Sequence, residues 1–227
     1  YDRGGRRDNP REAQVVAGLV LDHFRKTPDK TIGVIAFSYA QMDAVEDEIE
    51  RQLREHPEVE RFIKSDRLEG FFVKNLETVQ GDERDVILLS VGYGKDAQGK
   101  IELNFGPLNR EGGERRLNVA VTRARQRLIV VSSIRAGDLH MGKSPTKGLV
   151  HLQRYLDFAE RGISALVDEA DAMPMPITGL HEDVLAELKT LGFEAVPLVG
   201  CGQCRLDIGV RDPRQPGQFV LMLIGAA

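Results

Sequence analysis

Two spacings of apolar residues divide the first part of the chain into helices and strands. Apolar residues recur at helical spacing after Asn9, from Met42 to Leu53 and over residues 147–161, which predicts three amphipathic helices. Continuous apolar runs at 31–37, 71–75, 85–91 and 127–133 are typical of buried parallel strands. A shorter helix is expected at about 114–125. Strands that alternate with helices in this way predict an α/β fold built on a parallel sheet.

The residues Asn9, Pro10 and Glu12 predict where the first helix begins. Asn is a good N-cap, Pro suits the first helical position, and Glu at the third position completes a capping box. Pro28 is expected to end this helix.

The pattern changes after Gly162 and predicts a second, smaller domain. Residues 168–179 ("DEADAMPMPITG") are acidic and rich in proline, so we assign 163–179 as a linker. A helix at 180–191 and strands at 193–199, 205–212 and 218–224 then predict the start of a small α/β unit over 180–227. The chain begins without Met and ends on a strand-like run, so we expect it to be a fragment of a longer protein.

Composition narrows the function only a little. Hydrophobic residues make up 41% and charged residues 29%, with a formal net charge of −4, so nothing indicates a general nucleic-acid or membrane binder. No apolar run approaches the roughly 20 residues of a membrane span, and no signal peptide is visible, so we expect a cytoplasmic protein. Cys201 and Cys204 lack a second cysteine pair, so two small residues at a turn are favoured over zinc or redox chemistry.

The turn within "NLETVQGDERDVILLS" (75–90) offers groups that suit a nucleotide. Gly81 lets the backbone approach a ligand closely, and a turn containing Gln80 and Glu83 can present an amide N–H to phosphate and a carboxylate to a ribose hydroxyl. Because ligands of open parallel sheets lie at the carboxyl ends of the strands, we expect this turn there. A plain surface turn with solvated charges is the alternative.

The stretch "ERRLNVAVTRAR" (114–125) places four arginines around an apolar run. On a helix, Arg116 and Arg123 would share about the same face. Arginine grips phosphate with two hydrogen bonds, and on a rigid helix it can stabilise the charge of a transferring phosphoryl group. The alternative is a solvated basic face that adds little to stability.

Together these stretches resemble the second RecA-like motor domain of superfamily 1 helicases. The branch is the one that includes the nonsense-mediated-decay and Okazaki-fragment-processing helicases. "VQGDERDVILLS" resembles its motif V, "RRLNVAVTRARQRLIVVSS" its motif VI, "TIGVIAFSYAQMDAVEDEI" its motif IV, and "NPREA" the segment that opens this domain. The resemblance covers residues 1–162, and motif VI is its most specific part.

The resemblance implies a role for each matching residue. Arg123 would be the catalytic arginine finger, reaching the γ-phosphate of ATP bound on an upstream RecA-like domain of the same polypeptide. Gly81 and Glu83 would face the nucleotide, with Gln80 and Arg116 in support. The residues that would touch the phosphates of single-stranded DNA or RNA are Ser38, Gln41 and Asn75.

The chain departs from a complete motor because it lacks the pattern Gly-x-x-x-x-Gly-Lys-Ser/Thr and a Walker B acidic pair. The upstream domain would therefore hold most of the ATP and its Mg²⁺. We expect this chain alone not to hydrolyse ATP.

Residues 181–224 resemble the start of a restriction-endonuclease-like domain of the very-short-patch-repair kind. Glu182 and Asp207 match its first two acidic positions and would hold Mg²⁺ for phosphodiester hydrolysis. The third strand, "FVLMLIGAA", carries no acidic residue or lysine, so a structural remnant without nuclease activity is favoured. Two other functions stay open: a metal-dependent nuclease module with a helicase-like clamp, and a non-catalytic interaction domain.

Overall fold

A computed structural model describes residues 1, 5–63, 69–96, 98–142, 144–165, 179–201, 204–214 and 219–223 of the chain. It divides the chain into two compact units, residues 1–160 and 161–227. Most of the predicted linker, residues 166–178, lies outside the described residues. Each unit is presented separately.

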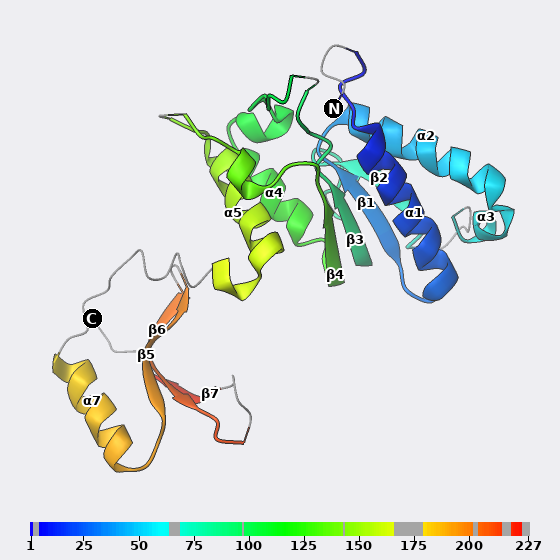
Figure 1. Cartoon of the computed structure of the whole chain (residues 1–227). Coiled ribbons are helices and arrows are strands. Elements are labelled where there is room, and N and C mark those ends of the chain that lie inside the picture. Colours follow the sequence, from blue (N-terminus) through cyan, green and yellow to red (C-terminus); the bar gives the residue numbers. More distant parts are fainter. Residues whose placement is uncertain are drawn as a thin grey trace. The chain divides into compact units, whose positions relative to one another are not determined.

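The first unit is built on a four-stranded parallel sheet in the order β2-β1-β3-β4 (Figure 1). Its strands are β1 (Ile32–Ala36), β2 (Phe72–Asn75), β3 (Arg84–Ser90) and β4 (Ala124–Val131). β1 and β3 are buried along nearly their whole length, as their continuous apolar runs predict. The predicted fold class, a RecA-like parallel sheet with flanking helices, agrees with this architecture.

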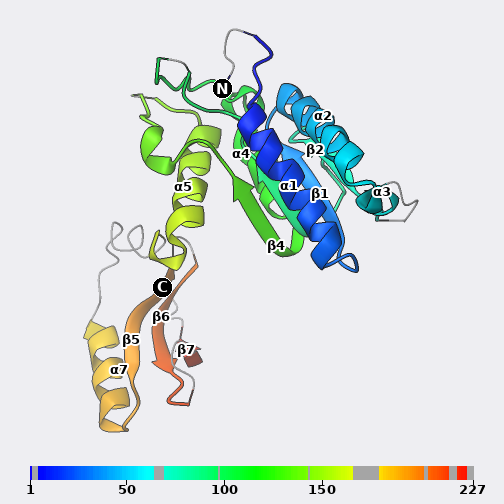
Figure 2. The ribbon, with the colours of Figure 1, turned by 45° about the vertical axis from the view of Figure 1, so that its right-hand side comes forward.

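Helices cover both faces of the sheet (Figure 1). Side chains of β1 point alternately to the two faces and therefore pack into two separate hydrophobic cores. Ile32 and Val34 pack with α1 (Pro10–Lys26), α2 (Tyr39–Glu55) and the short α3 (Pro57–Ile63). Ile35 and Phe37 pack on the other side with α4 (Gly113–Val121) and α5 (Lys147–Arg161). Figure 2 shows α1 lying across one face of the sheet. The sequence pattern did not predict α3.

The first helix begins as predicted, but only half of its capping box forms. The Asn9 side chain accepts a hydrogen bond from the backbone N–H of Glu12, and Pro10 occupies the first turn. The backbone N–H of Asn9 donates to Gln41 instead of the Glu12 carboxylate. Glu12 is therefore available for contacts elsewhere, which are described below.

The helix predicted over 114–125 is shorter in the structure, because α4 ends at Val121 and Thr122 caps it. Arg123 follows the helix, and Arg125 lies in β4, which starts at Ala124. The prediction that Arg116 and Arg123 share a helix face is therefore wrong. Pairing of β4 with β3 outweighs the helical preference of this stretch, since the backbone N–H of Arg84 bonds to the carbonyl of Arg123.

The long segment between β3 and α4 is less loop-like than its polar, glycine-rich sequence suggests. It contains a 3₁₀ helix, Gly106–Asn109, and it buries Tyr93, Phe105 and Leu108 in the core beside α4 and α5. A second 3₁₀ helix, Ala136–Asp138, follows β4.

The second unit contains α7 (Gly179–Thr190) and an antiparallel sheet in the order β5-β6-β7. Its strands are β5 (Ala195–Cys201), β6 (Cys204–Arg211) and β7 (Phe219–Leu223). Cys201 and Cys204 are paired in register at the end of β5 and the start of β6. Ile208 and Val210 of β6 are buried within this unit.

Candidate functional site

The predicted site residues lie at two opposite ends of the parallel sheet. The turn of Gln80, Gly81 and Glu83 directly precedes β3, so it lies at the amino ends of the strands. Its expected place at the carboxyl ends is wrong, because the segment after β2 returns along the sheet, with Leu76 and Val79 buried in the core. The predicted nucleic-acid contacts lie at the other end, where β1 and β2 finish.

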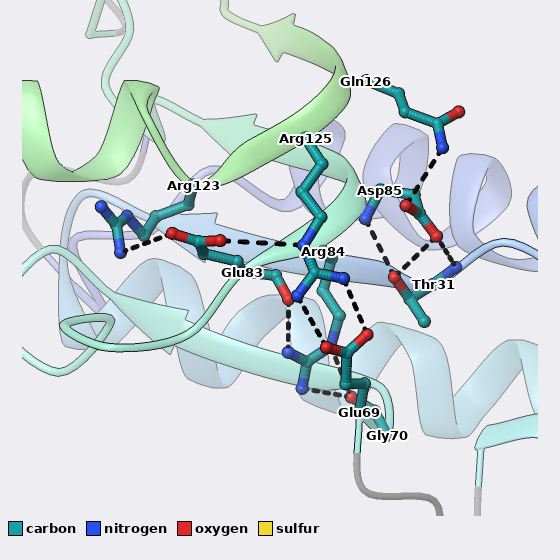
Figure 3. A network of polar contacts seen from close by, with 9 residues as sticks. All are labelled: Thr31, Glu69, Gly70, Glu83, Arg84, Asp85, Arg123, Arg125 and Gln126. Carbon is teal, nitrogen blue, oxygen red and sulfur yellow. Dashed lines mark hydrogen bonds and ion pairs between the residues drawn. The ribbon is translucent and has the colours of Figure 1, made fainter.

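At the amino ends, the carboxylate of Glu83 lies between two arginines (Figure 3). Its Oε1 is 3.6 Å from Nη1 of Arg123, and its Oε2 is 3.7 Å from Nε of Arg125. Arg123 is fixed at its base, because its Nε donates to the carbonyl of Val119 at 2.9 Å. Its side chain is 19% exposed, whereas that of Glu83 is 47% exposed. One arginine is thus held rigidly at the surface beside an accessible carboxylate.

Arg125 is also anchored from the opposite side, by Glu69. Its Nη1 and Nη2 donate to the two oxygens of Glu69 at 2.9 and 2.6 Å (Figure 3). These hydrogen bonds lower the pKa of the Glu69 carboxyl and raise that of the Arg125 guanidinium. The sequence gives no local signal for this pair, because its members are 56 residues apart.

Arg84, the first residue of β3, lies buried under the same cluster. Its guanidinium donates to the carbonyls of Gly70 and Glu83 and stacks on the ring of Phe72, 4.8 Å from the ring centre. Fixed contacts of this kind hold the backbone of Glu83 in place. Arg84 was not among the predicted site residues.

Asp85 and Thr31 join the starts of β3 and β1 through reciprocal hydrogen bonds (Figure 3). The N–H and hydroxyl of Thr31 donate to the Asp85 carboxylate at 2.9 and 3.0 Å, and the N–H of Asp85 donates back to the Thr31 hydroxyl at 2.9 Å. The backbone hydrogen bond from Thr31 is the main reason that the pKa of Asp85 is lowered. These contacts make the amino ends a rigid platform.

The other residues predicted to contact the nucleotide are Gln80, Gly81 and Arg116. Gln80 and Gly81 are exposed, and Gly81 has a φ of +90° with no atom within 4 Å of where a Cβ would stand. Arg116 donates to the carbonyl of Glu111 at 3.2 Å. Gly81 therefore leaves open space beside Glu83, while the structure shows Arg116 only as a local brace.

At the carboxyl ends, the three predicted nucleic-acid residues differ in accessibility. Ser38 caps α2 by accepting the N–H of Gln41, and it is partly exposed. Asn75 is 2% exposed, and its Oδ1 accepts from the backbone of Glu77 and Thr78. Gln41 is fully buried, so a direct contact of its side chain with nucleic acid does not fit this structure.

A cavity of about 830 Å³ opens next to Ser38. Tyr39, which is 55% exposed, lies at the edge of this cavity. Its polar and aromatic lining includes Arg7, Tyr93 and Arg110. Cations, a hydroxyl group and aromatic rings are the groups that bind phosphates and bases of single strands. Sequence analysis missed Tyr39, although it directly follows the predicted Ser38.

In the second unit, the predicted metal ligands lie on two different elements, α7 and β6. Glu182 is exposed on α7, whereas Asp207 lies 3.6 Å from Nε2 of His181. Across the described part of the chain, no three His, Cys, Asp or Glu side chains gather in a metal-binding arrangement. The metal site remains a prediction.

Comparison with known proteins first defines the family to which the chain belongs. Residues 2–135 match the family described as "AAA domain". Because this match spans more than half of the chain, the chain belongs to the AAA domain family.

Two curated relatives carry the printed name of uncharacterized ATP-dependent helicase, one from Mycoplasma genitalium and one from Mycoplasma pneumoniae. Each is 38% identical over 160 residues, which cover 67% of this chain and 14% of the relative. The chain thus matches a small part of the length of these helicases.

Among solved structures, the C-terminal domain of a possible DNA helicase from Lactobacillus plantarum is similar at 16% identity with a TM-score of 0.37. The similarity covers 66% of this chain and 78% of that one. None of the described helices has the length and apolar character needed to cross a membrane.

Proposed function

We propose that this chain is the second RecA-like motor domain of a superfamily 1, ATP-dependent helicase, and that it acts together with an upstream RecA-like domain of the same polypeptide. Membership of the AAA domain family and homology to part of two proteins named as helicases support the proposal. The close resemblance of residues 115–133 to motif VI points to the superfamily 1 branch.

The observation that carries this function is the fixation of Arg123. A transferring phosphoryl group gains most from a cation that is already oriented before the reaction. Hydrogen bonds to Val119 and Thr122 hold the Arg123 guanidinium at the end of α4, and Nη1 points to Glu83. In the proposed helicase this guanidinium reaches across the domain interface and stabilises charge on the γ-phosphoryl group of bound ATP.

The neighbouring residues suit the rest of a nucleotide. Gly81 leaves room for a close approach of the backbone, and the half-exposed Glu83 carboxylate can accept hydrogen bonds from ribose hydroxyls. Gln80 and Arg116 would have a supporting role in this site. The phosphate cradle and the Mg²⁺ ligands would come from the upstream domain, since their motifs are absent from this sequence.

The carboxyl ends of the strands would bind single-stranded DNA or RNA. Ser38 and the cations Arg7 and Arg110 line one cavity, and Tyr39 offers an exposed ring at its edge. Contacts to phosphates and ring faces carry no strong sequence preference, which suits a motor that moves along any strand. Placing the two sites at opposite ends of one sheet would let this domain link ATP turnover to movement.

The test is ATP turnover by the protein that carries both motor domains, with and without single-stranded DNA. Arg123→Ala is expected to lower turnover by about 10³–10⁵, as for other arginine fingers. Arg127→Ala is the matched control, because it removes an exposed arginine from β4, the strand that begins directly after Arg123. ATP turnover that does not change when single-stranded DNA is added, or that falls equally in both variants, would contradict the proposal.

A further inference from the structure

A group of buried polar side chains lies beneath the carboxyl ends of the sheet and takes no part in the sites proposed above. Its members are Asn9, Glu12, Gln41, Ser90 and Ser133, of which all but Ser133 are buried. They come from the first turns of α1 and α2, the end of β3 and the segment after β4. Segments far apart in the chain thus meet through polar contacts at one point.

Glu12 is the acceptor at the centre of this network, and it is 3% exposed. Its carboxylate accepts hydrogen bonds from the backbone N–H groups of Ser133 and Gly92 at 2.6 and 2.7 Å. The side chains of Asn9 and Ser90 donate to it at 3.2 and 3.3 Å. Because Gly92 and Ser133 follow β3 and β4, one side chain of α1 fixes the ends of two strands.

Gln41 joins α2 to the same network from the other side. Its Oε1 accepts the N–H of Asn9 at 2.8 Å, and its Nε2 donates to the Ser90 hydroxyl at 3.0 Å. The Ser90 hydroxyl therefore accepts a hydrogen bond from Gln41 and donates its single proton to Glu12. The geometry forms a continuous path from α1 through Ser90 to α2.

Gly92 lets Gln41 pack in this position. Its φ is +73°, and a Cβ there would stand 2.6 Å from Cγ of Gln41. The backbone and the network therefore fit each other closely, and neither can shift without the other.

Buried polar groups are a costly way to fill a core, because apolar residues of equal volume would avoid the loss of hydration. A fully satisfied network does, however, fix one arrangement of its elements. The elements fixed here continue directly into the cavity lining: Ser38 and Tyr39 precede Gln41 on α2, and Tyr93 follows Gly92. The network thus underlies the surface proposed to bind nucleic acid.

We propose that Gln41 and Glu12 are positioning residues, which hold Ser38, Tyr39 and Tyr93 in the arrangement that binds single-stranded nucleic acid. This inference rests on the proposed function. It gives Gln41 an indirect role in place of the contact that its sequence position suggested.

The first measurement is the affinity of the chain for a fluorescently labelled oligothymidylate, by fluorescence anisotropy. Gln41→Met keeps the helix and the side-chain volume but removes the amide, and we expect about 10-fold weaker binding. Val16→Ala is the control, because it removes buried volume from the same helix as Glu12 without touching the network. Urea unfolding of each variant shows how far stability has changed.

The second measurement reports the position of residue 39 itself. The chain contains no tryptophan, so Tyr39→Trp introduces a single probe whose time-resolved anisotropy follows motion at the cavity edge. Gln41→Met in this background should increase that motion, and Val16→Ala should not. Glu12→Gln should act like Gln41→Met, since an amide nitrogen would oppose one of the donors of Glu12.

The outcomes separate this inference from the proposed function. Absence of binding by the unchanged chain would contradict nucleic-acid binding itself. Normal affinity of Gln41→Met, or an equal loss in Val16→Ala, would overturn the positioning role alone. Weaker binding with greater probe motion only in the network variants is the expected result.

Discussion

Arg125 and Glu69 form an ion pair with two parallel hydrogen bonds, 2.6 and 2.9 Å long, at the amino ends of the sheet. Arg125 also approaches Glu83, the carboxylate that faces Arg123. The pair therefore places a second cation where it can orient Glu83 between two positive charges. Because both side chains are 42% exposed, this contact contributes little to stability.

The first prediction is that Arg125→Ala affects ATP turnover more than folding. Loss of Arg125 frees Glu83 from one side, so the carboxylate can draw closer to Arg123 and partly neutralise it. In the proposed protein with two motor domains we expect lower ATP turnover, with a smaller loss than in Arg123→Ala. The unfolding midpoint in urea should change little. A large loss of stability with normal turnover would show that the pair is only structural.

Glu69→Gln separates charge from position in this pair. It keeps an acceptor for one hydrogen bond of Arg125 but removes the negative charge, so Arg125 should still reach Glu83. We expect turnover between that of the unchanged protein and Arg125→Ala. Equal turnover in Glu69→Gln and Arg125→Ala would indicate that the charge of Glu69 itself is needed.

The sequence is sufficient to predict the sheet but not all of its connections. The apolar runs at 31–37 and 85–91 become the buried strands β1 and β3, because strands of a parallel sheet are covered on both faces and therefore bury successive side chains. The turn at Gln80 was placed at the wrong end of the sheet. Its position depends on the short return after β2, which buries Leu76 and Val79 and has no regular period.

The candidate site was predictable where a motif carries it and not where distant residues build it. Arg123 and Glu83 come from two motifs, and the structure brings them within 3.6 Å of each other. Gln41 was expected to touch the phosphates of nucleic acid, but its fully buried position depends on Asn9 and Ser90, which are 32 and 49 residues away. Local sequence cannot reveal such partners.

The second prediction compares Gly148 in α5 with Gly18 in α1. Gly148 lies against the carbonyl of Leu108, as does Gly113 in α4, so a methyl group on Gly148 would collide with that backbone. Gly148→Ala should destabilise the fold by about 1–3 kcal/mol through overpacking. Gly18→Ala is the matched control in α1, where nothing lies within 4 Å of the new methyl group. It should stabilise the fold by about 0.5–1 kcal/mol.

Urea unfolding of the two variants checks this prediction. Destabilisation by both would mean that α1 packs more tightly around Gly18 than the structure shows. An unchanged midpoint for Gly148→Ala would contradict the close approach of α5 to Leu108.

The third prediction concerns pH and Glu12. Burial raises the pKa of the Glu12 carboxyl above its ordinary value of 4.5, while hydrogen bonds from Gly92, Ser133 and Ser90 oppose the shift. Because this pKa is raised, the Glu12 carboxyl binds its proton more tightly in the folded state than in the unfolded chain. Its contribution to stability is thus full below about pH 4.5 and is lost as the pH rises through the folded pKa.

Glu12→Gln cannot titrate, so the difference between the two proteins isolates this effect. We expect the free energy of unfolding of the unchanged protein, relative to Glu12→Gln, to fall as the pH rises from 4.5 toward 7. Urea unfolding at several pH values measures it. A difference that stays constant across this range would show that Glu12 keeps its ordinary pKa.

The fourth prediction concerns the exposed ring of Tyr39 at the cavity edge. An aromatic ring beside the cations Arg7 and Arg110 can stack on a base while the cations approach the phosphates. Tyr39→Ala should weaken binding of single-stranded DNA by about 1–3 kcal/mol, the usual worth of one stacked base. Tyr39→Phe should bind almost normally, because the ring face is kept.

An oligonucleotide with one abasic position, moved step by step along the strand, tests whether the ring meets a base. When the abasic site lies opposite the ring, the unchanged protein should bind the oligonucleotide more weakly. The affinity of Tyr39→Ala should not fall any further at that position. Phe158→Ala is the control, because it removes another exposed ring of the first unit, on α5. If Tyr39→Ala and Tyr39→Phe weaken binding equally, the hydroxyl and not the ring makes the contact. If neither variant changes the affinity, the strand must lie elsewhere on the domain, and the cavity loses its proposed role.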